Sequence, residues 1–383
     1  MLQATMKFLI IPDKFKGSLT AQEVSAAIEA GIGKALPDAE SIIITASDGG
    51  DGFLNSVAEN VNAEEAGEVT VDALGDSTFY GSFLFDRAAE TAYIEMAVAS
   101  GMANLPEEKR NPLHTTTLGT GILASTAISH GAKKIYVGLG GSATNDGGIG
   151  FAAALGYSFH DCDGNEIPLT GEGLSQLARI EYDKEGGQLE GIEFFAVNDV
   201  RNPLFGPEGA AYVYAPQKGA SPEIVAQLDK GLRNLDTVVQ SELGQSEANT
   251  PGAGAAGGLG YGLRVFCGAE FVSGVDFILS LSGIEEILSS GEIDCIITGE
   301  GKIDDQTAYG KLVDGVAKAG QRHRVPVYAI CGSLQLTDTT TQELGLEDAI
   351  PIHSEGDDLS FTIKNAANLV EQKAEQLASR LAS

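Results

Sequence analysis

Short apolar runs alternate with stretches of helical apolar spacing at both ends of the chain, which predicts strands and helices in turn. A strand at 6–11 and a polar loop open the pattern, and Thr20-Ala-Gln-Glu23 has the form of a capping box at the start of the first helix. Further strands are expected at 42–45, 294–298 and 325–330, with helices beginning near Phe53 and covering 309–319 and 361–381. Such alternation favours a parallel sheet covered by helices on both faces.

The middle of the chain has a more mixed pattern. Segments at 82–85 and 91–95 predict antiparallel strands. Beyond them we expect helices at 118–130 and 222–239, strands at 134–139 and 192–197, and a short Ala-rich helix ending near Leu155. Because clean alternation flanks this region, the fold class is α/β: a discontinuous parallel-sheet domain, residues 1–66 and 290–383, with a second α/β domain of mixed sheet, residues 67–289, inserted into it.

Composition narrows the classes of protein that fit. A chain of 383 residues with 43% hydrophobic residues can bury a large core, whereas its formal charge of −30 opposes binding to nucleic acid or to an anionic membrane surface. The four cysteines form no C-x-x-C pair, so we expect reduced thiols and a cytoplasmic location. The first apolar run is too short for a signal peptide, and no run is long enough for a membrane span. The sequence leaves the oligomeric state open, including a homo-oligomer.

The loop Asp13-Lys-Phe-Lys-Gly-Ser-Leu-Thr20 follows the first strand, where open parallel sheets bind ligands. In so acidic a chain, Lys14 and Lys16 are candidates for contact with a phosphate or a carboxylate, with Gly17 and Ser18 beside them. The alternative is a pair of ordinary solvated lysines.

Two carboxylates follow the second expected strand. Asp48 and Asp51 are separated by two glycines, and this spacing can hold a hard cation such as Mg²⁺, which prefers oxygen ligands. A tight turn with an aspartate as helix cap explains the same residues.

A glycine-rich loop at 138–148 lies between an expected strand and an expected helix, so its backbone N–H groups could hold a phosphate. It lacks the Walker A pattern. The spacing Gly138-x-Gly140-x-x-Ala143, with Asp163 further on, matches a relaxed dinucleotide fingerprint, which keeps a nicotinamide-dependent oxidoreductase acting on a small hydroxy acid as an alternative. The candidate ligand contacts of this loop are Gly140, Gly141, Ser142, Thr144 and Asn145.

Three further features have candidate chemistry. A mixed-charge loop after the strand at 294–298 is suited to metal, phosphate or a substrate hydroxyl, although a solvated loop has the same composition. Asp199 follows a buried strand, and its carboxylate either acts as a general base or forms a turn that closes the strand. The glycine-rich tract at 251–262 fits close packing or ligand contact, and Glu95 is a lesser candidate, more in keeping with a solvent-facing strand residue. The residues of interest in the mixed-charge loop are Gly299, Glu300, Lys302, Asp304 and Asp305.

Together and in this order, these segments resemble the signature segments of the bacterial glycerate kinase family of type I. The resemblance spans nearly the whole chain and rests on these stretches: Asp13-Lys-Phe-Lys-Gly-Ser-Leu, Ser47-Asp-Gly-Gly-Asp-Gly, Gly140-Gly-Ser-Ala-Thr-Asn-Asp-Gly-Gly, Pro251-Gly-Ala-Gly-Ala-Ala-Gly-Gly and Thr298-Gly-Glu-Gly-Lys-Ile-Asp-x-Gln-Thr. It implies a flavodoxin-like domain with an inserted α/β domain, ATP and Mg²⁺ as cofactors, and D-glycerate as the acceptor that becomes 2- or 3-phosphoglycerate.

The resemblance assigns no catalytic roles, so these come from physical reasoning alone. We expect Lys16, Asp199 and Asp304 to take part in catalysis, because phosphoryl transfer needs positioning and charge stabilisation more than covalent chemistry. A nucleotide-binding module without catalysis is a third class, and the recurrence of charged groups in the loops argues against it.

Overall fold

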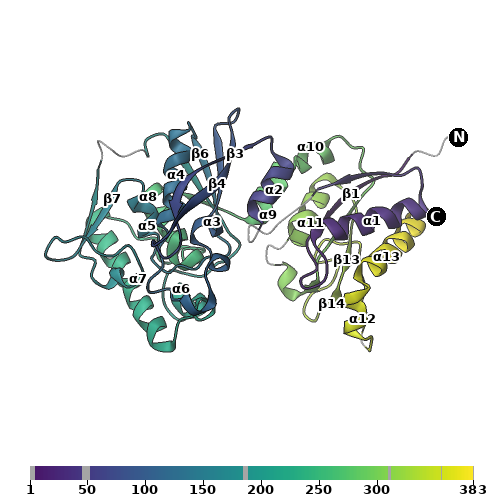
Figure 1. The fold of residues 1–383 in the computed structure, drawn as a ribbon. Coiled ribbons are helices and arrows are strands. Elements are labelled where there is room, and N and C mark those ends of the chain that lie inside the picture. The colour runs from purple at the N-terminus through teal and green to yellow at the C-terminus, as the bar shows by residue number, and fades with distance from the viewer. Residues whose placement is uncertain (1–4, 45–51, 184–188, 309–311, 355, 383) are drawn as a thin grey trace. The chain divides into compact units, whose positions relative to one another are not determined.

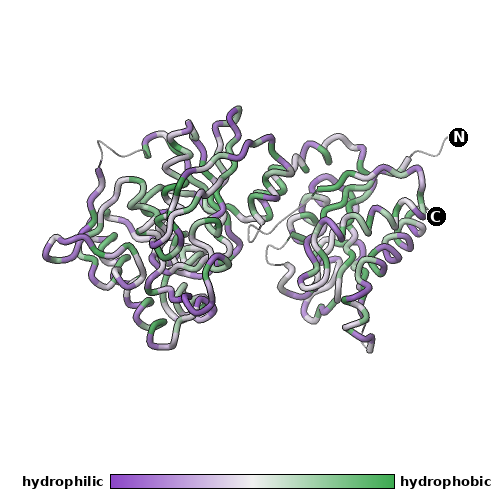
Figure 2. The backbone as a smooth tube through the Cα atoms, in the orientation of Figure 1, coloured by the Kyte–Doolittle hydropathy of each residue, from purple (hydrophilic) through white to green (hydrophobic). Residues whose placement is uncertain are grey.

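The chain forms two compact units, Met1–Asp48 with Val275–Ser383, and Gly49–Gly274 (Figure 1). The structure is a computed structural model, and it describes residues 5–44, 52–183, 189–308, 312–354 and 356–382. Hydrophobic segments concentrate inside each unit, and hydrophilic segments lie toward its periphery (Figure 2). Because Met1–Asp48 and Val275–Ser383 together form the first unit, that unit is built from both ends of the chain.

The limits of the two units differ from the domain limits expected at 66/67 and 289/290. Helix α2, Phe53–Asn60, packs on β4 and β5 of the second unit. At the other joint, α10, Ile284–Ser289, packs on α11, Leu312–His323, of the first unit. Tertiary packing therefore places each joint some 15 to 20 residues earlier in the chain than the sequence pattern indicated.

The sheet of the first unit is entirely parallel, as the alternating pattern predicted. Its spatial order is β15-β13-β11-β1-β2. Counted along this unit alone, that order is 2-1-3-4-5, the flavodoxin-like arrangement, whose direction reverses between β1 and β11. The strands are β1 Lys7–Pro12, β2 Glu40–Ile43, β11 Cys295–Gly299, β13 Val327–Cys331 and β15 Asp348–Pro351.

Helices cover both faces of this sheet. On one face, α1, Ala21–Ala35, packs closely along α13, Ala366–Leu381, and Gly31 leaves no room for a Cβ because the carbonyl oxygen of Glu371 would lie 2.3 Å from it. The predicted capping box of α1 is confirmed, with the Glu23 N–H donating to the Thr20 hydroxyl oxygen at 3.2 Å. On the other face, α11 packs on β11 and β13.

Short elements complete the first unit. The helix expected at 361–381 is divided at Asn365 into α12 and α13. The short elements are α9 Gly274–Leu281, whose first residue belongs to the second unit, β12 Lys302–Asp304, the 3-10 turn η6 Asp305–Ala308, β14 Ser333–Gln335 and α12 Leu359–Lys364.

The second unit contains a six-stranded mixed sheet in the order β10-β9-β6-β5-β4-β3. The antiparallel pairs predicted near its start are confirmed, whereas β5, β6, β9 and β10 run parallel. Their carboxyl ends therefore lie along one edge of the sheet. The strands are β3 Glu64–Val71, β4 Thr78–Asp86, β5 Thr91–Glu95, β6 Lys134–Gly138, β9 Glu193–Val197 and β10 Glu270–Val272.

Helices and one separate hairpin surround this mixed sheet. The hairpin joins β7, Tyr157–His160, to β8, Arg179–Tyr182. The α-helices are α3 Ala97–Ser100, α4 Leu118–Ser129, α5 Ile149–Ala153, α6 Ala210–Tyr214, α7 Pro222–Leu243 and α8 Leu259–Cys267, and the 3-10 turns are η1 Met102–Asn104, η2 Glu107–Lys109, η3 Gly173–Ser175, η4 Pro216–Lys218 and η5 Ala255–Gly258. In the described part of the chain, every helix is too short or too polar to cross a membrane.

Candidate active site

Two of the predicted loops meet at the carboxyl edge of the first sheet. Strands β1 and β11 are neighbours, and the Asp13 N–H donates to the Gly299 carbonyl oxygen at 2.7 Å. Further out, a Cβ placed on Gly301 would lie 3.2 Å from the Lys16 backbone nitrogen, so the two loops lie against each other. This contact is at the reversal point of the strand order, where flavodoxin-like sheets bind ligands.

The lysine loop presents its cationic side chains to solvent. Lys14 and Lys16 are both exposed, as is Gly17 with its φ of +78°. The Ser18 hydroxyl donates to the carbonyl oxygen of Ile363 at 3.4 Å, which ties the loop to α12. The lysines are thus accessible to an anionic ligand at the end of β1.

The loop after β11 is an ordered set of hydrogen bonds, and its inner part is closed to solvent. Glu300 is buried and accepts a hydrogen bond from the Thr307 hydroxyl at 2.7 Å, while the Asp304 N–H donates to the same hydroxyl oxygen at 3.1 Å. The Lys302 ammonium lies 3.0 Å from the Asp304 carboxylate, which retains 18% side-chain exposure. Glu300 therefore supports the loop from inside, and Asp304 lies near the surface beside a cation.

Asp305 has a structural role next to this group. Its carboxylate accepts hydrogen bonds from the backbone N–H groups of Thr337 and Asp338, both at 3.1 Å, and from the Thr337 hydroxyl. These bonds lower the pKa of Asp305, because they stabilise its ionised form. Asp305 thus anchors the segment after β14.

The second unit gathers other predicted residues at the carboxyl edge of its own sheet. The loop after β6 is held there, since the Leu139 N–H donates to the Val197 carbonyl oxygen at 3.1 Å and the Ala143 N–H to the Ser100 carbonyl oxygen at 2.9 Å. Gly141, at φ +70°, is exposed, while Thr144 and Asn145 are buried and Ser142 is 9% exposed. An anion would therefore meet Gly140 and Gly141 first.

Asp146 anchors the far side of this loop. Its carboxylate is fully buried and accepts hydrogen bonds from the Thr117 N–H and hydroxyl, both at 2.7 Å, and from the N–H groups of Gly148 at 3.1 Å and Gly150 at 3.3 Å. Four donors are the pattern of an ionised carboxylate. Burial nevertheless raises the pKa of Asp146, and the donors oppose this rise.

Lys218 is a residue of this site that the sequence analysis missed. Its ammonium donates to the Ser142 hydroxyl oxygen at 2.7 Å and to the Thr144 carbonyl oxygen at 2.8 Å. The side chain is 2% exposed, and burial lowers its pKa to about 7, although the charge of Asp146 opposes this. Lys218 follows Pro216 and precedes a glycine, a local pattern typical of a surface turn, so the only signal would have been its tertiary burial.

The Asn145 side chain lies between these two anchors. Both its amide oxygen and its amide nitrogen are buried without a hydrogen-bond partner in the described part of the chain. Buried polar groups are nearly always paired, so an unpaired amide requires a partner such as a water or a ligand.

The glycine-rich tract at 251–262 packs against the same loop. A Cβ at Gly257, whose φ is +69°, would lie 1.9 Å from the Thr144 carbonyl oxygen, and the Gly147 N–H donates to the Gly257 carbonyl oxygen at 3.2 Å. Close backbone packing, one of the two interpretations weighed for this tract, is therefore what the structure shows.

Two acidic candidates of the second unit have definite partners. Asp199 is exposed, and its carboxylate accepts a hydrogen bond from the Gly274 N–H at 2.9 Å. Glu95 accepts from the N–H groups of Gly52 at 3.3 Å and Leu54 at 3.2 Å, so it holds the start of α2 and is half-buried. The expectation of a solvent-facing Glu95 was wrong, because the beginning of α2 covers the end of β5.

The proposed metal-binding residues Asp48 and Asp51 lie outside the described residues. Within the described ranges, no group of three or more His, Cys, Asp or Glu side chains could hold a metal ion.

The dinucleotide interpretation lacks its structural context. The first helix after Gly138 is α5, which begins only at Ile149, whereas the fingerprint requires a helix opening at the third small residue. Asp163 is exposed in a turn after β7, with its N–H donating to the Asp161 carboxylate at 2.9 Å.

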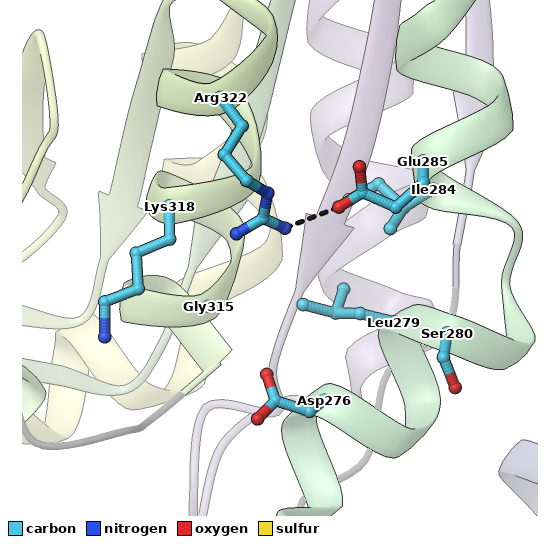
Figure 3. A pocket seen from close by; sticks show the side chains of 8 residues that line it. All are labelled: Asp276, Leu279, Ser280, Ile284, Glu285, Gly315, Lys318 and Arg322. Atoms are coloured by element: carbon cyan, nitrogen blue, oxygen red, sulfur yellow. Dashed lines mark hydrogen bonds and ion pairs between the residues drawn. The ribbon is translucent and has the colours of Figure 1, made fainter.

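A separate pocket of about 130 Å³, open to solvent, lies in the first unit among α9, α10 and α11 (Figure 3). Its charged groups have partners, since Arg322 pairs with Glu285 and the Lys318 ammonium lies 2.7 Å from the Asp314 carboxylate. None of the predicted site residues is in its lining, which consists of Asp276, Leu279, Ser280, Ile284, Glu285, Gly315, Lys318 and Arg322.

Loops rich in glycine and charge at the carboxyl ends of parallel strands are typical of α/β enzymes that bind small anionic ligands. The chain belongs to the glycerate kinase family, because the family model described as "Glycerate kinase family" matches residues 8–382.

Individual relatives are similar to this chain over more than nine-tenths of their own length. A glycerate kinase of Halalkalibacterium halodurans is 40% identical over 370 residues, which cover 97% of each chain. A glycerate 2-kinase of Escherichia coli (strain K12) is 38% identical over 96% of this chain and 93% of its own. A crystal structure of a candidate glycerate kinase 2 from Salmonella typhimurium LT2 has a TM-score of 0.83 and 37% identity, covering 99% of this chain and 98% of the other. The α/β fold and the kinase class predicted from the sequence are confirmed, and nothing favours the oxidoreductase.

Proposed function

We propose that this protein is an ATP-dependent kinase that transfers the γ-phosphoryl group of ATP to a hydroxyl oxygen of D-glycerate, giving 2- or 3-phosphoglycerate. The observation that carries the proposal is the family match over residues 8–382. Two loops with exposed lysines or glycines support it, one at the carboxyl end of β1 and one after β6.

Charge explains why these loops matter. ATP and glycerate are both anions, and the chain has a formal charge of −30, so cations and backbone N–H groups must offset repulsion where the reactants bind. Lys14 and Lys16 offer exposed ammonium groups at the end of β1, and Lys302 adds a third on the adjacent loop. In our proposal Lys16 contacts the transferred phosphoryl group or the carboxylate of glycerate.

A general base is needed for the acceptor hydroxyl. In the proposed step, a carboxylate takes the hydroxyl proton while that oxygen forms a bond to the γ-phosphorus, and the bond to the β-phosphate oxygen breaks to release ADP. Asp304 and Asp199 are the two candidates, because each lies at the carboxyl edge of its sheet with part of its surface accessible. Asp304 lies 3.0 Å from the Lys302 ammonium, a cation that offers charge compensation to a phosphate bound beside it.

We also propose Mg²⁺ as the metal of the reaction, held by Asp48, Asp51 and phosphate oxygens. Carboxylate oxygens are the hard donors that Mg²⁺ prefers, and one or two of them suffice when phosphates complete the coordination. When bound, the ion would neutralise charge on the phosphates.

Location and assembly are further proposals. The four cysteines are free thiols, two of them buried, as in proteins of a reducing compartment, which supports the cytoplasm. The net charge argues against a nucleic-acid partner, and D-glycerate and ATP are the proposed partners. A homo-oligomer is compatible with these features.

A coupled assay that follows ADP formation with D-glycerate, ATP and Mg²⁺ tests the function. We expect turnover that depends on all three, and phosphorus NMR of the product distinguishes phosphorylation at C2 from phosphorylation at C3. Absence of ADP formation would contradict the proposal. Fluorescence titration with NADH tests the oxidoreductase, and the kinase predicts no saturable binding.

A further inference from the structure

Lys218 is an ionisable side chain buried in a position that the proposed chemistry does not yet use. It ends η4, between α6 and α7, and only 2% of its surface is exposed. Removing an ammonium from water is costly unless hydrogen bonds and charges compensate. The burial of Lys218 therefore requires compensation from the groups around it.

The protein itself compensates only in part for the cost of burying the Lys218 ammonium. The ammonium has three N–H donors, and in the described part of the chain it finds two acceptors, the Ser142 hydroxyl and the Thr144 carbonyl, both neutral. Asp146 is the carboxylate whose charge acts on it, and four other donors already occupy that carboxylate. An additional negative charge near the loop would therefore be stabilised by Lys218.

The two acceptors of Lys218 belong to the loop that was predicted to hold an anion. Lys218 fixes this loop at Ser142 and Thr144, and the Asp146 carboxylate fixes its far end through the N–H groups of Gly148 and Gly150. Between these anchors, the buried amide of Asn145 has no partner among the described residues. The loop is thus held at both ends around a polar group that nothing in the described chain satisfies.

We propose that Lys218 is a positioning residue of this enzyme: it holds the loop 140–145 in its anion-binding conformation, and its buried charge stabilises an oxyanion of a reactant bound to that loop. The inference rests on the proposed kinase function. The oxyanion is the carboxylate of glycerate or a phosphate of ATP, two sources of the same chemistry. Because the side chain is buried, it acts through Ser142 and the loop backbone rather than by direct contact.

Binding should be linked to protonation. Burial lowers the pKa of Lys218 to about 7, so at about pH 8 most molecules have the neutral amine. An anion on the loop favours the charged form and raises that pKa, so binding draws a proton from the buffer. A purely structural lysine would show no such uptake.

Calorimetric titration of the whole protein tests the proposal. D-glycerate and a non-hydrolysable ATP analogue are titrated separately at pH 8, each in two buffers with different ionisation enthalpies, Tris and HEPES. We expect proton uptake for one of the two ligands in the wild type, and its loss in Lys218→Met together with roughly tenfold weaker binding, the equivalent of one pKa unit. The affected ligand identifies the source of the oxyanion.

The control is Lys230→Met, which removes an exposed lysine from α7, and it should bind both ligands as the wild type does. Lys218→Arg retains the charge and should recover part of the lost affinity. If Lys218→Met binds both ligands with unchanged affinity, or takes up the same protons as the wild type, the proposal is wrong. If that variant does not fold, absence of proton uptake in the wild type overturns it equally well.

The same experiments separate this inference from the proposed function. A wild-type protein that forms no ADP from ATP and D-glycerate contradicts the kinase. A wild-type protein that turns over normally, paired with a Lys218→Met variant of unchanged affinity and proton uptake, contradicts only the assignment of Lys218.

Discussion

Asp146 accepts two hydrogen bonds from Thr117, one from its backbone N–H and one from its hydroxyl, both at 2.7 Å. The same hydroxyl oxygen accepts from the Phe151 N–H at 2.8 Å. One threonine therefore joins the start of α4, the loop after β6 and α5. This arrangement holds the loop after β6 from its buried side.

Thr117→Val should destabilise the second unit. The substitution keeps the shape of the side chain but leaves the Asp146 carboxylate with one donor fewer and the Phe151 N–H without an acceptor. Each buried polar group left without a hydrogen-bond partner costs about 1–3 kcal/mol. Urea unfolding followed by circular dichroism measures the loss. Thr126→Val is the control, since among the described residues the Thr126 hydroxyl bonds to the Ile122 carbonyl within α4 alone, and it should cost less than about 1 kcal/mol.

Gly257→Ala should be far more damaging than Gly244→Ala. Both glycines have nearly the same backbone conformation, with φ of +69° and +70°, so both substitutions cost about 1–2 kcal/mol of backbone strain. Only Gly257 also places the new Cβ 1.9 Å from the Thr144 carbonyl oxygen, whereas Gly244 faces open space. Thermal unfolding and ligand titration of both variants measure the difference. Equal stability of the two would show that the contact with the loop is not rigid.

Lys16→Met should reduce kcat/KM by about tenfold or more with little effect on stability. The Lys16 side chain is exposed at the end of β1, so its loss removes charge compensation for an anionic reactant and no buried contact. Steady-state kinetics with each reactant varied in turn shows which KM changes. Lys109→Met removes another exposed lysine, on η2, and should behave as the wild type.

Asp304→Asn and Asp305→Asn should separate catalysis from stability in two neighbouring residues. Loss of a general base lowers kcat by about 10²–10⁴-fold, so Asp304→Asn should lose turnover while it unfolds like the wild type. Asp305→Asn should instead weaken the anchoring of Thr337 and Asp338, with a measurable loss of stability and a smaller effect on kcat. Unchanged turnover of Asp304→Asn would remove it from the site and leave Asp199 as the base.

The pH dependence of stability provides a further test of Lys218. Its pKa is about 7 in the folded protein and about 10.5 in the unfolded chain, so between these values the unfolded state binds more protons. The free energy of unfolding contributed by this group therefore rises with pH across that window. Urea unfolding of the wild type and Lys218→Met at pH 7 and pH 9 isolates the effect. The wild type should gain stability relative to the variant at the higher pH, and a constant difference would contradict the lowered pKa of Lys218.

Much of the fold follows from local pattern. The Thr20 and Glu23 capping box, the buried strands β1 and β11 of the first unit and the antiparallel start of the second all depend on residues close in sequence. The hairpin of β7 and β8 could not be predicted, because its strands are four residues long and pair across some twenty residues. Similarly, apolar spacing continues through Asn365, so the break between α12 and α13 left no local signal.

In the candidate site too, some features could be predicted from local sequence and others depend on residues far apart in the chain. Loops at strand ends could be recognised from glycine and charge, and the structure does bring the Lys16 loop against Gly301. Lys218 lies more than 70 residues from its partners in the sequence, and Asp146 is buried only because Thr117 and two glycine N–H groups surround it. Burial of a charged residue is a property of the folded neighbourhood, which residue type alone does not reveal.

The split first unit has a consequence for synthesis of the chain. The Lys7 N–H donates to the Asp294 carboxylate across 287 positions, and β1 has its partner β11 only after that whole interval has been made. At about 5–20 residues per second, the wait is roughly 15 to 60 s. During this wait, residues Phe8 to Ile11 have no neighbouring strand on the side where β11 later pairs. All four residues are fully buried in the finished protein. A nascent chain released before residue 299 would thus expose an apolar strand edge, which is a site for aggregation.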